Sequence, residues 1–181
     1  MCNSCQGTTW IDVLDGDGVA RVRRCQCWVD LHRGDGVPEE FKAATLDNWG
    51  GTYEHAVTAA RRFLSDVHDP GGRDLYLCGS IGTGKTRLAC SILNEYYCQQ
   101  RAGTFRRVPW LLVQLQPSGG SDLEYMGPVV AAPVLILDDL GAERSAATDY
   151  TRRTLLAVAE QRRDAGRRTI WTSNLTPSAV G

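Results

Sequence analysis

The sequence predicts an α/β protein in which a parallel sheet with flanking helices follows a small module with four cysteines. Three observations carry this prediction. An apolar run at 75–78 leads through a glycine-rich loop into a helical pattern, and a second apolar run at 134–137 ends in two aspartates. Continuous apolar runs of this length are typical of parallel strands that are covered on both faces. Four of the seven cysteines, finally, lie before residue 28.

The composition is that of a soluble globular protein. Hydrophobic residues make up 43% and charged residues 23% of the 181 residues, and the formal net charge is −1. No global positive field marks nucleic acid as a partner, so any such contact must be local. The longest uncharged apolar stretch, 128–137, is about half of the roughly 20 residues in a membrane helix, and no signal sequence precedes it. We therefore expect a cytoplasmic protein that does not enter a membrane.

The N-terminal cysteines predict a zinc site. Cys2 and Cys5 form a CxxC pair, and Cys25 and Cys27 form a CxC pair. Without an export signal, clustered cysteines favour metal ligation over disulfides. Four thiolates complete the tetrahedral coordination of Zn²⁺ and leave no open position, so this metal would be structural. Four reduced thiols, or His32 in place of one cysteine, are the alternatives.

The segment between the two cysteine pairs has the pattern of a β-hairpin. Residues 10–15 and 19–23 read as short strands, and the glycine-rich turn at 16–18 joins them. Such a hairpin would return the second cysteine pair to the first. Because so small a segment buries too little surface to fold unaided, we expect the metal to decide whether it folds. We assign residues 1–36 to this module and 37–52 to a linker.

The glycine-rich loop is a P-loop. A helical pattern over 53–67 precedes the strand at 75–78, and the next eight residues read GSIGTGKT. A strand, GxxxxGK[ST] and a helix in this order predict a nucleotide site, because the loop turns its N–H groups toward the phosphates and the helix N-terminus adds positive potential. We expect ATP to be bound by Gly79, Ser80, Ile81, Gly82, Thr83, Gly84, Lys85, Thr86 and Arg87.

Specific roles follow for the residues near the phosphates. Lys85, one of only two lysines in the chain, would neutralise the β- and γ-phosphates, and the Thr86 hydroxyl would bind Mg²⁺. The strand at 134–137 is expected beside the P-loop strand, so that Asp138 at its end also holds the Mg²⁺. Asp139 stands where many such ATPases carry the glutamate that polarises the attacking water, but its side chain is one methylene shorter. A solvated acidic turn is the alternative for both aspartates.

A third strand is predicted at 168–172 and leads into Ser173 and Asn174. An amide at this strand end can reach between the γ-phosphate and the acid at 138 and orient water. Because Ser-Asn also begins turns, the two upstream phosphate motifs are what favour this role. The expected catalytic set is Lys85, Asp138, Asp139 and Asn174.

One more helix is predicted, over 147–165. Its apolar side would be buried and its arginines would lie on the solvated face. These sets are Leu155, Leu156, Val158 and Ala159 on the buried side and Arg152, Arg153, Arg162 and Arg163 on the solvated side. The remaining cysteines, Cys78, Cys90 and Cys98, are expected to be small buried residues rather than reactive thiols.

Together these motifs resemble the DnaC/DnaI-like helicase loaders and their IstB-like transposition-helper relatives among the AAA+ ATPases. The resemblance spans nearly the whole chain. It rests on the cysteine pairs, the LYLCG segment that leads into the P-loop, FKAATLDN at 41–48, LILDDLG at 135–141 and TIWTSN at 169–174. It makes 53–181 an AAA+-type P-loop core and puts 45–48 near the adenine. By resemblance, Lys85 and Thr86 are Walker A, Asp138 and Asp139 Walker B, and Asn174 sensor 1.

The function that the resemblance implies is ATP-dependent loading of a replicative DNA helicase of the DnaB type. It also implies that the ATPase part binds single-stranded DNA, that the zinc module contacts the helicase, and that copies of the chain form a homo-oligomer. Two alternatives stay open. One is an IstB-like regulator of a transposase, and the other is a non-catalytic zinc adaptor or truncated remnant whose P-loop only binds nucleotide. Asp138-Asp139 together with Asn174 argues against a nucleotide kinase.

The C-terminal end departs from the family pattern. Thr176-Pro177-Ser178 is a helix-start signal, yet the sequence stops at Gly181, before the arginine finger, fifth strand and sensor 2 element of the family. We therefore expect a truncated core whose P-loop strand is bare on one side. Since a trans arginine is worth roughly 10³–10⁵ in phosphoryl-transfer rate, we also expect ATP binding without robust hydrolysis.

Overall fold

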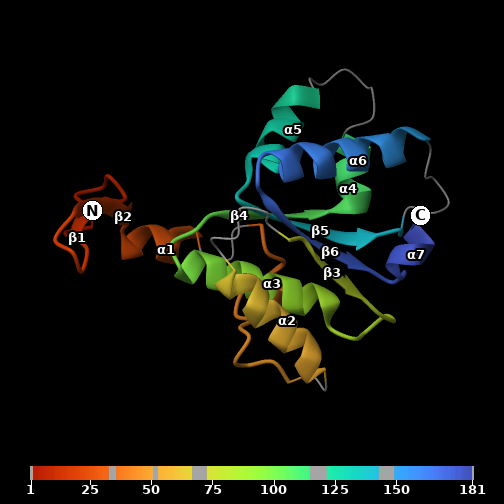
Figure 1. The fold of residues 1–181 in the computed structure, drawn as a ribbon, viewed down its shortest axis with the longest axis horizontal. Coiled ribbons are helices and arrows are strands. Elements are labelled where there is room, and N and C mark those ends of the chain that lie inside the picture. Colours follow the sequence, from red (N-terminus) through yellow and green to blue (C-terminus); the bar gives the residue numbers. More distant parts are fainter. Residues whose placement is uncertain are drawn as a thin grey trace.

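The computed structural model describes residues 2–32, 36–50, 53–66, 73–114, 122–142 and 149–180. A sheet lies between two layers of helices, and the N-terminal hairpin stands to one side of them (Figure 1). In chain order the elements are β1 (Trp10–Leu14), β2 (Ala20–Arg24), α1 (Gln26–His32), the 3-10 helix η1 (Glu39–Phe41), α2 (Glu54–Ser65), β3 (Leu75–Cys78), α3 (Lys85–Cys98), β4 (Gly103–Arg107), α4 (Val108–Gln114), α5 (Asp122–Ala131), β5 (Val134–Leu140), α6 (Asp149–Asp164), β6 (Arg168–Ser173) and α7 (Pro177–Val180).

The central sheet is parallel, as predicted, with the strand order β3-β6-β5-β4. The expectation that the strand at 134–137 lies directly beside the P-loop strand is wrong, because β6 lies between β5 and β3. The carboxyl ends of parallel strands nevertheless share one edge of the sheet, so all three motif-bearing strands end close together. Within the described residues, β3 pairs only with β6 and forms an edge of the sheet, as expected for the P-loop strand.

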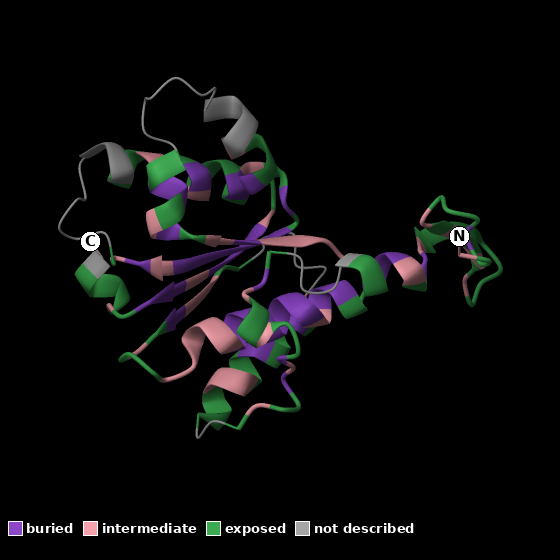
Figure 2. Ribbon diagram, turned by 180° about the vertical axis from the view of Figure 1, so that it is seen from behind, coloured by how far each residue is buried: buried purple, intermediate pink, exposed green. Residues whose placement is uncertain are grey.

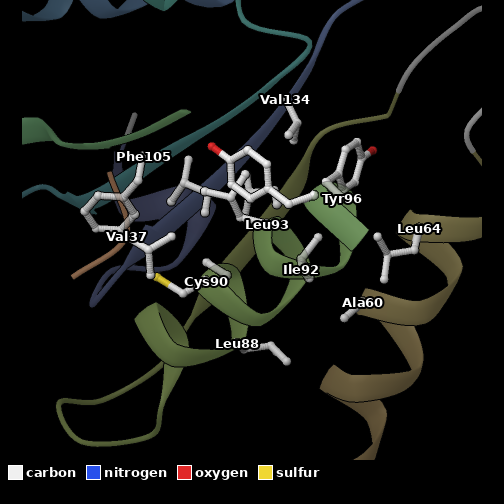
Figure 3. Close-up of a cluster of buried hydrophobic side chains, with 14 of the residues drawn as sticks. Val37, Ala60, Leu64, Leu88, Cys90, Ile92, Leu93, Tyr96, Phe105 and Val134 are labelled. Atoms are coloured by element: carbon white, nitrogen blue, oxygen red, sulfur yellow. The ribbon is translucent and has the colours of Figure 1, made fainter. Parts of the chain in front are cut away.

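Two apolar clusters hold helices on the two faces of this sheet. Ile136 of β5 packs with α2 and α3, whereas Leu135 and Leu137 pack with α4, α5 and α6. Figure 3 shows Ile92, Leu93 and other side chains of α3 filling the space between the sheet and α2. Because β5 is covered on both faces, its apolar run does not alternate with polar residues.

The helix α1 joins the cysteine module to the core. Its residues Trp28 and Val29 are buried in the same cluster as α3, and the Trp28 ring lies 6.1 Å from that of Tyr97. The hairpin beyond α1 is mostly exposed (Figure 2). The module is therefore anchored through buried side chains of α1, while its hairpin faces solvent.

Five elements were not predicted from the sequence, namely α1, η1, β4, α4 and α5. The GTFRR sequence of β4 shows no apolar alternation because this strand lies at the edge of the sheet and buries only Phe105. A proline, Pro128, lies inside α5, which removes one of the helical backbone donors. None of the helices in the described parts of the chain combines the length and apolarity that crossing a bilayer requires.

The predicted faces of α6 need correction. Leu156 is 52% exposed, whereas Arg162, expected on the solvated face, is 0% exposed. The Arg162 guanidinium lies against the C-terminal end of α5, where backbone carbonyl groups lack helical partners and need donors. Its hydrogen bonds go to the carbonyl oxygens of Val129, Val130, Ala132 and Arg168 and to the Thr169 hydroxyl.

The cysteines outside the N-terminal module follow the expectation only in part. Cys90, within α3, is completely buried, as predicted. Cys78 and Cys98 are exposed, because Cys78 ends β3 at the start of the P-loop and Cys98 ends α3. Neither of these two positions is covered by the layers that bury Cys90.

Candidate nucleotide site and cysteine cluster

The P-loop connects β3 to α3 and has the backbone that its glycines allow. Gly82 and Gly84 adopt positive φ angles of 82° and 87°, which side chains with a Cβ rarely tolerate. A Cβ at Gly84 would also lie 2.7 Å from Cη2 of Trp49. The Thr83 hydroxyl donates to the carbonyl oxygen of Ser80 at 2.9 Å and closes the loop. Two features therefore require glycine at position 84, namely its positive φ angle and the Trp49 indole packed on it.

Lys85 and Thr86 begin α3 at the point where the loop ends. The Nζ of Lys85 donates to the carbonyl oxygens of Gly79 and Ser80, each at 2.9 Å, which holds the ammonium group against the loop. The Thr86 hydroxyl donates to Oδ1 of Asp138 at 2.8 Å. The structure therefore brings together the P-loop and the first of the two predicted acids.

Asp138 is 0% exposed, and its two oxygens differ in their surroundings. Oδ1 accepts hydrogen bonds from the hydroxyls of Thr86 and Thr172, at 2.8 and 2.7 Å. Oδ2 is buried without a hydrogen bond, and Nε of Arg107 is the nearest cation among the described residues, at 3.9 Å. Burial raises the pKa of Asp138 above its usual value, and the two hydroxyl groups oppose this shift.

These residues fit a magnesium ion. Mg²⁺ prefers oxygen ligands, and the site offers the Thr86 hydroxyl and the Asp138 carboxylate beside a loop suited to phosphates. The Oδ2 atom of Asp138 is buried without a hydrogen bond, so the charge of this carboxylate is incompletely compensated. A divalent cation would compensate a carboxylate that is otherwise costly to bury.

Asp139 and Asn174 line one hollow of about 550 Å³ together with the P-loop residues Ile81 to Arg87. Asp139 has a left-handed backbone, with φ of 62°, and its N–H donates to the Thr172 hydroxyl at 3.0 Å. Asn174 follows β6 directly, and the preceding Ser173 hydroxyl donates to the Leu140 carbonyl oxygen at 2.6 Å. Thr172 and Ser173 therefore fix the strand ends that carry the two predicted residues.

The segment before α2 packs on the P-loop. Arg87 donates through Nη2 to the Asn48 carbonyl oxygen at 2.7 Å, and its guanidinium lies 5.9 Å from the centre of the Trp49 ring. Asn48 is held in turn by Thr45, whose N–H donates to Oδ1 of Asn48 at 2.9 Å. The stretch 45–48 is thus joined through Asn48 to Arg87, directly after the loop, and its place near the adenine stays a prediction.

A second hollow, of about 470 Å³, shares Trp49, Thr83 and Lys85 with the first as lining residues. It extends from the P-loop residues Gly79, Ser80 and Lys85 to a largely apolar wall. This wall includes Trp49, Tyr53, Ala56, Leu77 and Leu88. An apolar wall next to a phosphate-binding loop is the surrounding that a nucleotide base requires.

The four N-terminal cysteines lie together, with all of their sulfur atoms within 4.8 Å of one another. The Sγ atoms of Cys2 and Cys25 are 3.7 Å apart, and those of Cys5 and Cys27 are 3.4 Å apart. Tetrahedral Zn²⁺ with bonds of about 2.3 Å separates its sulfur ligands by about 3.8 Å, so the cluster fits this metal. The side chain of His32, the alternative ligand, lies outside the described residues.

The thiols of this cluster differ in acidity. Backbone N–H groups of Ser4 and Cys5 lower the pKa of Cys2 to about 6. The hydrogen bond with Cys5, and then burial, raise the pKa of Cys27 to about 12. A thiolate is therefore favoured at Cys2, and a bound divalent cation would favour deprotonation of all four thiols by its own charge.

The predicted hairpin explains why the two cysteine pairs meet. β1 and β2 pair antiparallel with Trp10 opposite Arg24, which returns the chain to the first pair. The N–H of Cys25 donates to the Thr9 carbonyl oxygen at 2.9 Å. The Arg24 guanidinium lies over the rings of Trp10 and Trp28, 3.8 and 5.0 Å from their centres, and so joins the hairpin to α1.

Comparison with known proteins connects this site to a family. No protein-family model matches the chain. The replicative helicase loader DnaI of Bacillus subtilis is 32% identical over 122 residues, which are 65% of this chain and 39% of DnaI. A putative insertion sequence ATP-binding protein, y4pL of Sinorhizobium fredii, is 35% identical over 117 residues, 63% of this chain and 44% of that protein. The crystal structure of the DnaC helicase loader matches with a TM-score of 0.68 and 28% identity, over 77% of this chain and 81% of that one.

The chain is similar to the DnaC/DnaI/IstB-like group of AAA+ ATPases. It spans less than half of the length of the curated relatives that it matches. In this chain the P-loop residues Ile81 to Arg87, Asp139 and Asn174 line one hollow, and Asp138 accepts a hydrogen bond from Thr86. Sequence reasoning missed Arg107, Thr172 and Trp49 as residues of the site. Only Thr172 could have been found from the sequence, because it is a hydroxyl residue just before the predicted Ser-Asn.

Proposed function

We propose that this AAA+ protein binds ATP with Mg²⁺ and acts in DNA replication as a DnaC/DnaI-like helicase loader. The observation that carries the proposal is the hydrogen bond from Thr86 to Asp138, which joins the P-loop to a buried acid on another strand. The likeness to DnaI and DnaC, both named helicase loaders, supports the cellular role.

Each predicted site residue has a role in this proposal. The loop N–H groups and Lys85 hold the phosphates, and Thr86 with Asp138 holds the metal. When bound, Mg²⁺ supplies positive charge that offsets the charge on the β- and γ-phosphates. Asp139 and Asn174 orient water at the γ-phosphate. Because the Asp139 side chain is one methylene shorter than the glutamate of many such ATPases, we propose that ATP binding is strong and hydrolysis slow.

The zinc module is the proposed contact to the helicase. The hairpin exposes Leu14 and Val22, which its register puts on one face together with Trp10. Exposed apolar side chains on a short, metal-held hairpin are suited to a protein partner. Zinc would thus act structurally, by holding this surface in shape. The division of the chain at residue 36 remains a prediction.

Single-stranded DNA is the proposed second partner. Trp110 and Gln114 line a hollow of about 370 Å³ beside α4, and the Trp110 ring is largely exposed. A base of a single strand can stack on such an exposed aromatic ring. A cytoplasmic location and self-association accompany this role as predictions.

The test is capture of a purified replicative helicase hexamer by the zinc-loaded full chain, with and without ATP. We expect capture that ATP strengthens, and we expect Lys85→Ala to lose this ATP effect. Lys42→Ala is the matched control, because Lys42 is the other lysine and its ammonium group pairs with Glu39 at the surface. Capture of a transposase instead of the helicase would favour the IstB-like alternative, which the likeness to y4pL supports. Helicase capture that Lys85→Ala leaves unimpaired would favour a non-catalytic adaptor.

A further inference from the structure

Arg107 is the last residue of β4 and lies beside the candidate metal site. In the parallel pairing of β4 with β5 it is the register partner of Asp138. Its Nε lies 3.9 Å from Oδ2 of Asp138, and its side chain is 45% exposed while that of Asp138 is fully buried. The guanidinium therefore stands between solvent and a buried carboxylate.

Arg107 approaches the oxygen of Asp138 that no other described residue engages. Oδ1 accepts the hydroxyls of Thr86 and Thr172, whereas Oδ2 has no hydrogen bond. Lys85, the P-loop cation, is bonded to loop carbonyl oxygens. Among the ion pairs between described residues, only that of Arg107 involves Asp138.

The position of Arg107 matters because negative charge is concentrated at this site. Asp138 and Asp139 are adjacent acids, and the proposed ligand adds several negative charges. Burying a carboxylate without a nearby cation costs free energy. The side chain can lower this cost by rotating so that the carboxylate points away from its neighbours. Turning away would break the bonds that aim Oδ1 of Asp138 at Thr86.

We propose that Arg107 is a positioning residue for the Mg²⁺ site of this chain. Its guanidinium balances the charge on Oδ2 of Asp138 and so keeps Oδ1 directed at the Thr86 hydroxyl. Arg107 acts through Asp138 and does not itself touch nucleotide or metal. This inference rests on the proposed nucleotide site. It means that Mg²⁺-dependent nucleotide binding also depends on a residue that is neither in the P-loop nor one of the two aspartates.

The neighbouring arginine provides a matched control. Arg106 is the register partner of Leu137 rather than of Asp138. Its Nη1 donates to the Phe105 carbonyl oxygen at 2.8 Å. Arg106→Gln removes the same charge from the same strand without removing a contact to the acid.

The experiment measures binding of a fluorescent, non-hydrolysable ATP analogue to the zinc-loaded full chain, in EDTA and over a Mg²⁺ titration. For Arg107→Gln we expect the Mg²⁺ concentration at half-maximal effect to rise about tenfold, as when a residue supporting a metal ligand is lost. Affinity for the analogue in EDTA should stay unchanged. Arg107→Lys should restore most of the Mg²⁺ response, and Arg106→Gln should match the wild type.

Other outcomes would overturn the inference. Equal losses of affinity with and without Mg²⁺ would make Arg107 a structural residue only. An unchanged or lower Mg²⁺ requirement in Arg107→Gln would show that it does not support the metal site. Absence of any analogue binding by the wild type would overturn the proposed function itself, and this failure is recognised before any variant is compared.

Discussion

Thr86 on α3 and Asp138 on β5 are joined by a hydrogen bond of 2.8 Å across 52 positions of sequence. Thr172 of β6 donates to the same carboxylate oxygen, Oδ1. Three segments that are remote in sequence thus meet at one atom. Since β6 lies between β3 and β5, its threonine is placed to bridge the P-loop side of the site to the acid.

Because Asp138 is buried, we expect the free energy of unfolding of the metal-free protein to depend on pH. Burial raises the pKa of Asp138 above 3.8, so the folded state holds this proton more tightly than the unfolded chain does. Stability is therefore favoured below the raised pKa and is lost as the pH rises through it. Asp138→Asn removes this loss, so the variant should gain stability relative to the wild type between about pH 4 and neutrality.

Urea unfolding of both proteins in EDTA, at a series of pH values, measures this difference. The comparison isolates Asp138 because all other titrating groups are shared. The same variant should lose the Mg²⁺ dependence of nucleotide binding. A wild type that is the more stable of the two at pH 7.5 without metal would contradict the expectation.

Gly84 should tolerate no side chain. Its φ of 87° and the Trp49 atom 2.7 Å from a built Cβ oppose any substitution. Gly84→Ala is expected to destabilise the protein by about 1–3 kcal/mol and to weaken nucleotide binding, because Trp49 must move away from the loop. Gly16→Ala is the control, since no atom lies within 4 Å of a Cβ there. Thermal unfolding and titration with a fluorescent ATP analogue check both effects, and equal behaviour of the two variants would refute the argument.

Local sequence patterns predicted the parts of the fold that depend on local physics. The GSIGTGKT loop, the apolar run before Asp138 and the paired cysteines each have a residue spacing that one kind of structure explains. The bounds of β3 and β6 were therefore predicted within one residue, whereas β5 runs three residues beyond its predicted end. The meeting of Cys2 with Cys25 followed from the hairpin that the sequence implied.

Contacts that depend on strand order could not be predicted in this way. The edge strand β4 carries no apolar alternation, and without it Arg107 cannot be placed opposite Asp138. Arg162 shows a related limit, because its burial depends on carbonyl groups of α5, whose end cannot be located from sequence spacing. In both cases an arginine compensates a charge or a set of hydrogen-bond acceptors on another segment of the chain.

The cysteine cluster should bind one zinc ion that is structural. Removing one ligand by Cys5→Ser is expected to abolish zinc binding and unfold the hairpin, since apparent zinc binding free energies of about 10–16 kcal/mol exceed what so small a module gains from burial. The sheet and nucleotide affinity should persist, because the clusters around β5 do not involve the hairpin strands.

Zinc content by elemental analysis and nucleotide titration test this expectation. Cys98→Ser is the control, because this exposed cysteine at the end of α3 is not among the four clustered cysteines. Stoichiometric zinc in purified Cys5→Ser would rule out the four-thiolate site. Loss of zinc in Cys98→Ser would also rule out the four-thiolate site.

Arg162 is expected to be among the most sensitive positions outside the nucleotide site. Its buried guanidinium donates to carbonyl groups that end α5, and desolvation lowers its pKa to about 10, so it stays charged at neutral pH. Arg162→Met leaves those buried acceptors without donors, which should cost at least about 3 kcal/mol in the free energy of unfolding. Arg163→Met, at an exposed position, should stay within about 0.5 kcal/mol of the wild type. Urea denaturation of both variants decides the matter, because equal stabilities would mean that Arg162 is not needed at the end of α5.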